Sequence, residues 1–417
     1  MAEAEIPDTG AEDYDPFELF DRAQGAGNVR DPYPDFAEQR RKGPVEKINL
    51  AEQMGASTGD ITPPGSIDAY VVHSHDAVSE VLRNGKRFSS KGYAATMGVV
   101  MGHTILEMDE PEHSHYRGLI QQAFTRRALE RWERDLVRPI VDGMIDRFAP
   151  RGHADLVREL TFPFPVNVIA GMLGLPEEDL PQFHRWAVEL ISVGFDWQLG
   201  LAASKSLADY FRPILNERRK QPREDLISVL AHAELDGQRL TDDEIFAFLR
   251  LLLPAGAETT YRSSSNLLFG LLTHTDQLDA LHEDRSLMDR ATEEGLRWEP
   301  PLTGIMRMCT EDTEVCGTKI PAGAVIMVNL GAANRDEARR ENSEGFDIRR
   351  PPKQHMAFAF GPHRCLGMHL ARMETRVALD ALLDRLPNLR LDPAAEDVHI
   401  TGQGFRAPRQ LPVLFDS

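Results

Sequence analysis

The chain has 417 residues, 41% of them hydrophobic and 27% charged, and carries a formal net charge of −19. These values are typical of a soluble globular protein, and the acidic balance argues against a general nucleic-acid-binding protein, which would present a basic surface. Three cysteines are too few for a disulfide framework, and no apolar run is long enough to span a membrane. The acidic amino terminus lacks the pattern of a signal peptide, so a cytoplasmic protein without a membrane span is expected.

No internal repeat or long Gly/Ser linker divides the chain. This predicts one domain over residues 1–417, with about the first 25 residues flexible because polar termini are often untethered. Residues 31–45 predict a short helix that ends at Gly43-Pro44, and residues 68–83 predict a strand followed by a helix. From 131 to 231 the pattern is mostly helical, with breaks at 149–153, 173–179 and 220–225.

The clearest helix begins at Thr241, which forms a capping-box pattern with Glu244. Apolar residues then recur at helical spacing, and the run is apolar on nearly all sides, so this helix is expected to be central. The four residues of the stripe are Ile245, Phe248, Leu249 and Leu252. Pro254 removes a backbone N–H and is expected to bend the helix one turn before Thr259.

The sequence pattern changes after Pro300. Short alternating runs around Gly and Pro predict small sheets, a last helix follows Cys365, and residues 404–415 end the chain with strand-like residues. The sequence therefore predicts a mainly α fold with small β-sheets.

Cys365 stands between two histidines, in a loop containing Gly and Pro, where the last helix is expected to begin. The amino terminus of a helix stabilises a thiolate, and Gly361 and Gly367 would let the backbone approach a flat ligand closely. A buried structural cysteine is the alternative for a lone Cys. A zinc site is disfavoured because no second Cys follows the CxxC spacing.

The segment from 358 to 367 resembles the haem-binding loop of the cytochrome P450 family, Phe-Gly-x-Gly-x-His-x-Cys-x-Gly. Five residues match this pattern: Phe358, Gly361, His363, Cys365 and Gly367. Ala359 stands in place of the first glycine. In the family the cysteine is the axial thiolate of haem b, which favours O–O bond cleavage. The resemblance therefore implies that Cys365 ligates the iron and that the other matched residues bind the cofactor.

A second segment, AGAETT, lies in the predicted central helix. The Thr259 hydroxyl can bond back to the carbonyl of Ala255, and Ala255 and Gly256 leave room for a small diatomic ligand beside the acid Glu258. A helical Thr usually has no such role. The order of these four residues, however, resembles the family's oxygen-activating groove. The resemblance implies that Thr259 and Glu258 are the proton-delivery pair and that Ala255 and Gly256 lie against the cofactor.

Glu294 and Arg297 lie three residues apart in a predicted helix. An ordinary surface pair at this spacing contributes only about 0.2–0.5 kcal/mol. In the family the pair is a structural lock that a basic residue upstream of the cysteine loop completes. Counting back from Cys365 places that residue at Gly345, so the third member is expected to be missing or to come from elsewhere.

His113 and Arg117 lie one helical turn apart. The resemblance implies that they hold the haem propionates together with Arg307 and His363, because buried carboxylates require cationic partners. The alternative, a zinc site on one of two histidine pairs, lacks further ligands nearby: His113 with His115, or His73 with His75.

The resemblance covers nearly the whole chain and is strongest to the soluble bacterial members. It implies a P450 fold with haem between the central helix and the Cys365 loop. It also implies a monomeric monooxygenase that inserts one atom of O₂ into a hydrophobic small molecule. No flavin or nicotinamide fingerprint is present, so electrons from NAD(P)H are expected through a separate ferredoxin and its reductase. A peroxide-driven peroxygenase and a non-catalytic haem sensor are the alternatives, and the acid–Thr pair argues against both.

This interpretation predicts a docking surface for the electron donor and a pocket for the substrate. An acidic ferredoxin is expected to dock on basic residues near the cysteine loop, namely Arg126, Arg127, Arg364, Arg372 and Arg376. The substrate pocket is expected to be walled by residues 91–108, 184–201 and 301–306 together with Phe248, Leu252 and Phe405. This lining suits a hydrophobic molecule, and steroid, terpenoid, fatty acid and polyketide all remain open.

Overall fold

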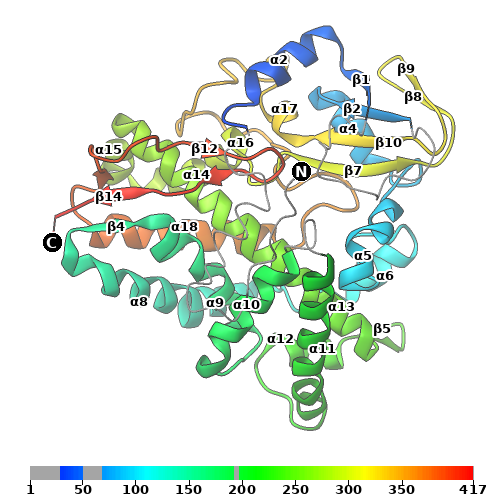
Figure 1. Ribbon diagram of the computed structural model, residues 1–417, viewed down its shortest axis with the longest axis horizontal. Coiled ribbons are helices and arrows are strands. Elements are labelled where there is room, and N and C mark those ends of the chain that lie inside the picture. The colour runs from blue at the N-terminus through cyan, green and yellow to red at the C-terminus, as the bar shows by residue number, and fades with distance from the viewer. Residues whose placement is uncertain (1–28, 50–67, 192–196, 417) are drawn as a thin grey trace.

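The computed structural model describes residues 29–49, 68–191 and 197–416. The expected flexible amino terminus lies outside these ranges, and the single domain over residues 1–417 stays a prediction. Helices fill most of the molecule, and the largest sheet lies at one side of it (Figure 1). The predicted class, mainly α with small sheets, is confirmed.

The largest sheet has five strands in the order β1 (Val45–Ile48), β2 (Ala69–Val72), β10 (Val325–Asn329), β7 (Gly304–Cys309) and β3 (Phe88–Ser89). Strand β10 runs parallel to β2 and antiparallel to β7. Helix α4 (His75–Arg83) follows β2 and buries an apolar face against the sheet, with Ser74 capping its first turn. The strand and helix predicted for residues 68–83 are thus confirmed.

Smaller sheets are built from two- and three-residue strands. One has the order β11 (Arg390–Leu391), β14 (Pro412–Leu414) and β4 (His153–Asp155). The two-stranded pairs are β5 (Glu234–Leu235) with β6 (Gln238–Arg239), β8 (Thr313–Val315) with β9 (Thr318–Ile320), and β12 (Ile400–Thr401) with β13 (Ala407–Pro408). The short strands predicted after Pro300 are therefore present.

The helices end where Gly and Pro interrupt the pattern, as expected at 149–153, 173–179 and 220–225. Before the central helix they are α2 (Tyr33–Lys42), α5 (Met97–Met101), α6 (Glu112–Gln121), α7 (Arg126–Trp132), α8 (Arg138–Phe148), α9 (Pro163–Met172), α10 (Leu180–Ile191), α11 (Trp197–Lys220) and α12 (Leu226–His232). After it come α15 (Thr275–Glu283), α16 (Met288–Trp298), α17 (Leu330–Asn334) and α18 (Met368–Arg385).

The central helix consists of α13 (Asp242–Leu253), a π-helical segment (Pro254–Glu258) and α14 (Thr259–Thr273). The capping box of Thr241 and Glu244 is present, and the predicted apolar stripe is buried. The hydroxyl of Tyr116, on α6, donates a further hydrogen bond to Glu244. Because Pro254 lacks an N–H, the regular ladder is interrupted there, and the helix widens into a π turn at the predicted bend.

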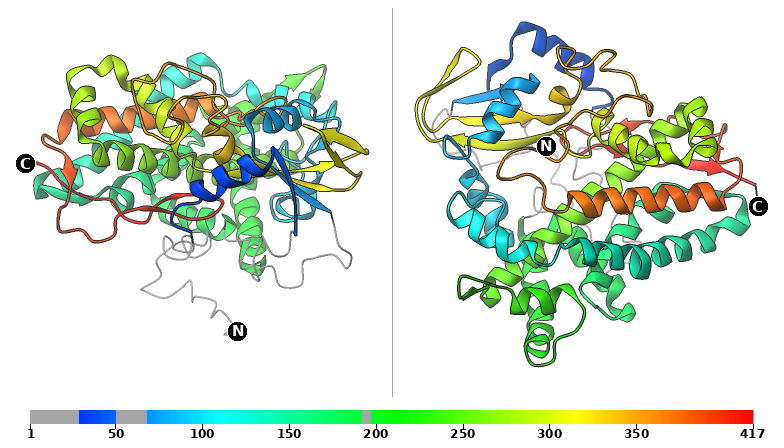
Figure 2. Two further views of the ribbon diagram at one scale, coloured as in Figure 1. Left: turned by 90° about the horizontal axis from the view of Figure 1, so that it is seen from above. Right: turned by 180° about the vertical axis from the view of Figure 1, so that it is seen from behind.

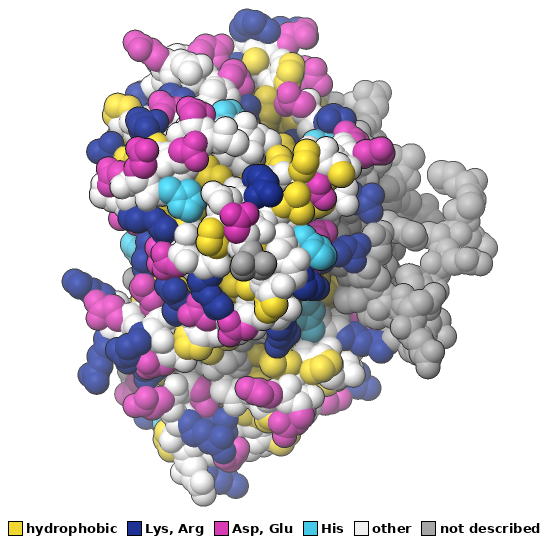
Figure 3. All heavy atoms as spheres, turned by 90° about the vertical axis from the view of Figure 1, so that its left-hand side faces the viewer, with side chains coloured by type: hydrophobic (Ala, Val, Ile, Leu, Met, Phe, Trp, Pro, Cys, Tyr) yellow, Lys and Arg dark blue, Asp and Glu magenta, His cyan; other side chains and the backbone are white. Residues whose placement is uncertain are grey.

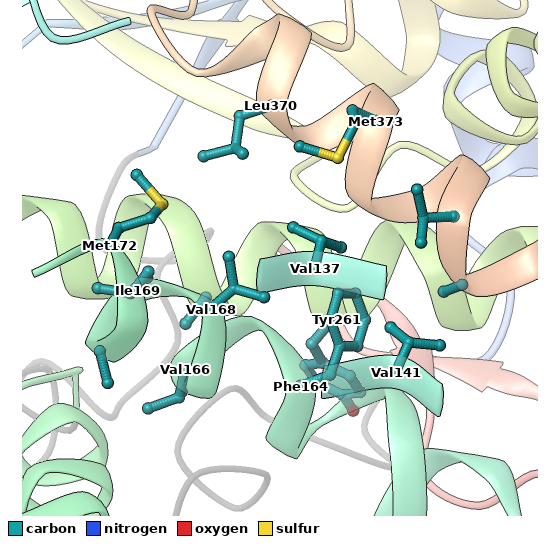
Figure 4. Packing of buried hydrophobic residues seen from close by; sticks show 14 of the residues in the cluster. Val137, Val141, Phe164, Val166, Val168, Ile169, Met172, Tyr261, Leu370 and Met373 are labelled. Carbon is teal, nitrogen blue, oxygen red and sulfur yellow. The ribbon is translucent and has the colours of Figure 1, made fainter. Parts of the chain in front are cut away.

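The main apolar core holds the central helix against α9, α16 and α18. In Figure 4, Leu370 and Met373 of α18 lie across from Val168 and Ile169 of α9, with Tyr261 of α14 beside them. Each large apolar side chain buried in this way contributes about 1.5–3 kcal/mol. The view from behind in Figure 2 shows α18 running alongside α14, and the Thr260 hydroxyl of α14 donates a hydrogen bond to Glu374 of α18.

The outer surface mixes charges of both signs. Acidic and basic side chains are interspersed over the face shown in Figure 3, and ion pairs such as Arg138 with Asp380 and Arg285 with Asp380 join neighbouring helices. Within the described ranges, none of the helices combines the length and apolar character needed to cross a membrane.

Candidate active site

The loop before α18 has two residues in the left-handed backbone region. Gly361 has φ +75°, and a Cβ at this position would collide with the carbonyl oxygen of Leu82. Ala359 has φ +54°, a conformation that an L side chain adopts only at a cost. The backbone N–H of Cys365 donates to the carbonyl of Phe358 at 2.9 Å and closes the loop. The backbone therefore explains why glycine is favoured at both positions.

The Cys365 side chain faces a space inside the molecule. It is exposed to that space, yet burial by the surrounding protein raises the pKa of its thiol, while the Gly367 N–H and nearby arginines act in the opposite direction. A thiol that a small molecule can reach although protein surrounds it lines an internal hollow. At Gly367, which precedes α18, a Cβ would have no neighbour within 4 Å. The hollow therefore reaches the backbone at the start of the helix.

The Thr259 hydroxyl donates to the Ala255 carbonyl at 2.7 Å, as predicted. Ala255 is exposed although it lies in the central helix, so this turn also borders open space. Gly256 differs from expectation, because a Cβ there would lie 3.1 Å from Cδ1 of Ile169. The missing side chain thus permits close packing of helix α9, and the expected role of Gly256 beside the cofactor stays a prediction.

Glu258 and Thr259 are adjacent in sequence but face different partners. The buried Glu258 carboxylate lies 3.4 Å from Nε of Arg262, one turn further along, and burial raises its pKa to about 7 against the opposing effect of Arg262. It forms no hydrogen bond with the Thr259 hydroxyl in the described structure. The two side chains expected to act as a pair are therefore not in direct contact.

Sequence reasoning missed a second buried acid, Glu374 of α18. Burial raises the pKa of this carboxyl to about 8, and Thr260 donates a hydrogen bond to it at 3.2 Å. The spacing of Glu374 within an amphipathic helix gave no signal of this contact, because its partner lies 114 residues away.

Four side chains able to carry positive charge converge on one edge of the hollow. The rings of His113 and His363 lie 4.0 Å apart, and burial together with His113, Arg307 and Arg117 lowers the pKa of His363 to about 3. Glu110 is the carboxylate that approaches this group, 3.2 Å from Nδ1 of His113.

Several hydrogen-bond donors of these four side chains lack strong acceptors among the described residues. Nε2 of His113 is buried and lacks a hydrogen-bond partner within the described part of the chain. The guanidiniums of Arg117 and Arg307 donate to the backbone carbonyls of Arg364 and Met306, each at 2.7 Å. An anionic ligand would satisfy His113 and relieve the mutual repulsion. A thiol on the wall and cations on the edge therefore fit a haem with its two propionates.

Comparisons with known proteins agree with this geometry. The model of the family described as Cytochrome P450 matches residues 182–403. Cytochrome P450 monooxygenase PikC from Streptomyces venezuelae is 36% identical over 401 residues, which is 94% of this chain and 92% of the relative. The chain belongs to the cytochrome P450 family. As a member of it, the protein is a haem-thiolate monooxygenase that uses haem b.

Further relatives support the same assignment to the P450s. Steroid C26-monooxygenase from Mycobacterium tuberculosis strain H37Rv is 39% identical over 324 residues, covering 76% of this chain and 81% of the relative. The crystal structure of CYP109E1 from Bacillus megaterium in complex with testosterone is similar with a TM-score of 0.82 at 32% identity, covering 93% of this chain and all of that one.

The P450 lock around Glu294 and Arg297 is complete, but its third member is not at Gly345. Arg297 donates two bonds of 2.7 Å to the buried Glu294 carboxylate, and Nε of Arg350 reaches the same carboxylate at 3.2 Å. Gly345 contributes its carbonyl, which accepts from both arginines. Counting back from the cysteine failed because a long side chain reaches the site from five residues further along.

Some of the basic residues expected to dock a ferredoxin form ion pairs within the chain, and others do not. Arg372 makes a two-bond ion pair with Glu293, and its guanidinium also lies 4.5 Å over the Phe358 ring. Arg376 pairs with Glu133, and Arg126 pairs with Glu130. Three of the five cations are thus already paired with carboxylates of the same chain, and the expected ferredoxin dock stays a prediction. Neither of the other two, Arg127 and Arg364, has a carboxylate within ion-pair distance in the described ranges.

Proposed function

We propose that this P450 hydroxylates a hydrophobic small molecule with Cys365 as the axial ligand of the haem iron. The observation that carries the assignment is the open, desolvated thiol of Cys365 at the start of α18. The other cysteines lack such a setting, since Cys309 is buried and donates to the Glu311 carbonyl, and Cys316 lies on the surface near Glu80.

The chain's own residues would hold the cofactor at its edge and its face. His113, Arg117, Arg307 and His363 would bind the propionates, and the loop residues Phe358, Gly361 and Gly367 would lie against the ring. Haem supplies the activation of O₂, so that one oxygen atom enters a C–H bond of the substrate and the other leaves as water.

The turn around Thr259 would deliver protons to the hollow. Glu258, with its pKa near 7, holds or releases a proton close to neutral pH. Because its carboxylate faces Arg262 and not Thr259, the proton would reach the hollow by rotation of the Glu258 side chain or through water. The Thr259 hydroxyl would then present the proton at the surface of the hollow.

The ligand assignment is tested by spectroscopy of Cys365→His. Thiolate-ligated haem gives a characteristic absorption band in the reduced CO complex, and we expect the variant to lose this band together with monooxygenase activity. Cys316→Ser, a change at the exposed cysteine, should keep both. An unchanged CO spectrum in Cys365→His would exclude Cys365 as the ligand.

Electrons would come from NAD(P)H through a ferredoxin and its reductase. We propose that the ferredoxin docks near Arg364, a cation left unpaired among the described residues that adjoins the candidate ligand. Arg364→Glu should slow reduction more at low than at high salt, because salt screens attraction between exposed charges. Arg41→Glu makes the same charge change on α2 and should have little effect. Equal slowing at both salt concentrations would contradict a docking role.

The substrate is proposed to be a bulky apolar molecule. Val99 on α5 is 52% exposed, which is unusual for such a side chain, and Leu201 at the start of α11 is 39% exposed. Part of the expected wall, residues 192–196, lies outside the described ranges. The relatives named for steroid oxidation and the neighbour bound to testosterone make steroids the first compounds to test. A saturable Soret shift with steroids, and none with fatty acids of equal length, would support this class.

A further inference from the structure

A cavity of about 260 Å³ lies against α16, apart from the haem hollow. Its lining contains five basic side chains and three acidic ones. The mouth includes the exposed Asp289, Arg290 and Lys353, whereas Glu294 and Arg340 are buried at the floor. The cavity therefore narrows from an exposed rim towards buried charges.

Most of the acidic groups at this cavity are already engaged. Glu294 accepts from Arg297 and Arg350, and Glu293 is bound in two places by Arg372 of α18. Asp289 is left at the rim, next to Arg290. The floor thus holds three guanidiniums around a single carboxylate, that of Glu294.

Arg340 is the cation at this floor that has no ion-pair partner among the described residues. Its side chain is buried, and its Nη2 donates to the carbonyls of Lys353 and Gln354 at 2.7 and 2.6 Å. No carboxylate lies within 4 Å of it in the part of the chain that is described. Burial, together with repulsion from other arginines including Arg297, lowers its pKa to about 10 against the opposing attraction of Glu294. A buried cation in this state costs free energy that a bound anion would recover.

We propose that this cavity binds a small phosphate-class oxyanion, held by Arg340 at the floor and by Arg290 and Lys353 at the rim. Guanidinium groups match tetrahedral oxyanions through paired N–H donors, and a dianion balances the excess positive charge of the floor. The volume accommodates one phosphate group with bound water, or the phosphoryl end of a larger molecule. The site is independent of the reaction assigned to the haem hollow.

The test is thermal unfolding of the holoenzyme in inorganic phosphate at constant ionic strength, with chloride as the replaced anion. Phosphate stabilises many proteins by exclusion from their surface, and that effect rises without saturation. Binding at the cavity should instead give a saturating rise in the unfolding temperature. A parallel titration with glycerol 3-phosphate distinguishes free phosphate from a phosphorylated molecule, according to which saturates at the lower concentration.

Variants separate the site from general effects of phosphate. Arg290→Gln removes a rim donor without breaking an internal bond and should raise the half-saturating concentration about tenfold, as expected for one charge-assisted hydrogen bond. Arg340→Gln should abolish saturation, and calorimetry on Arg290→Gln keeps the test decisive if Arg340→Gln does not fold. Arg349→Gln, at an exposed position outside the lining, should behave like the parent.

Two outcomes would overturn the proposal. One is a linear rise in unfolding temperature that is equal in all variants. The other is the absence of any phosphate effect while Arg290→Gln slows reduction by ferredoxin, because the cavity would then serve a protein partner and not a small oxyanion.

Discussion

The network around Glu294 and the helix turn from Pro254 to Thr259 lie in different parts of the molecule and are built in opposite ways. Glu294 accepts bonds from two arginines and from the backbone N–H of Asp347, all within 3.2 Å. On the central helix, Glu258 has one ion pair at 3.4 Å and Thr259 one hydroxyl bond. Redundant bonds join α16 to the segment around Arg350, whereas the turn for which we propose proton delivery has few bonds. Stability and chemistry should therefore respond to different substitutions.

The largest effect is expected from Arg350→Met. The change removes one cation of a buried ion-pair network together with its bonds to three backbone carbonyls, and breaking such a network costs about 3–5 kcal/mol. We expect a large loss of unfolding free energy in urea and a low haem content after purification. Arg349→Met, at the neighbouring exposed position, should change the free energy by less than about 0.5 kcal/mol. Normal stability in Arg350→Met would show that Arg297 alone sustains the network.

Thr259→Ala should change the reaction and leave stability close to that of the parent. Haem content and NADH consumption should stay close to the parent values, while product falls and hydrogen peroxide rises because proton supply to the hollow fails. Thr260→Ala is the matched control, since the Thr260 hydroxyl faces Glu374. If Thr259→Ala keeps full coupling of NADH to product, the threonine only shapes the helix.

The pH dependence of stability tests the buried acids of this second region. Glu258 has its pKa raised from 4.5 to about 7 in the folded state, so the folded protein binds this proton more tightly than the unfolded chain. Its contribution is therefore fully present below pH 4.5 and is lost as the pH rises through about 7. Glu374 acts in the same direction, with a pKa raised to about 8.

Urea unfolding at several pH values measures this effect. Glu258→Gln and Glu374→Gln should each flatten the fall in unfolding free energy between about pH 5 and pH 8, and the double variant should flatten it most. A parallel slope in all four proteins would show that neither carboxyl stays protonated in the folded state.

The smallest effect is expected at Ala359. Its φ of +54° costs an L residue about 1–2 kcal/mol, part of which the greater unfolded-state entropy of glycine offsets. Ala359→Gly should therefore raise the unfolding free energy by about 0.5–1 kcal/mol. Ala357→Gly, in the same loop without a positive φ, should lower it. Destabilisation by both would mean that the Ala359 methyl group makes contacts that outweigh the backbone cost.

The features that could be predicted from the sequence depend on neighbours within one helical turn. The Thr241–Glu244 capping box, the Thr259 bond to Ala255 and the interruption at Pro254 follow from backbone geometry, which spacing specifies directly. Helix ends at Gly and Pro were predictable for the same reason.

The features that could not be predicted depend on remote partners. Arg350 bonds to Glu294 across 56 residues, so the local sequence could not show that it is the third member of the lock. Arg372 bonds to Glu293 across 79 residues, so this ion pair could not be predicted from spacing either. The close approach of Ile169 on α9 to Gly256 is a property of helix packing and gave no signal in the sequence. The ion pairs of Glu258 with Arg262 and of Arg126 with Glu130 could have been inferred from their spacing of four residues.

The bond from Tyr116 to Glu244 has a consequence for the order of assembly. It joins α6, which carries His113 and Arg117, to the first turn of the central helix across 128 residues of chain. A contact of such long range forms only after the intervening segment has closed, which is slow compared with helix formation. The cationic edge that would receive the haem is therefore completed late in folding, and newly made chains should capture the cofactor only once the central helix is in place.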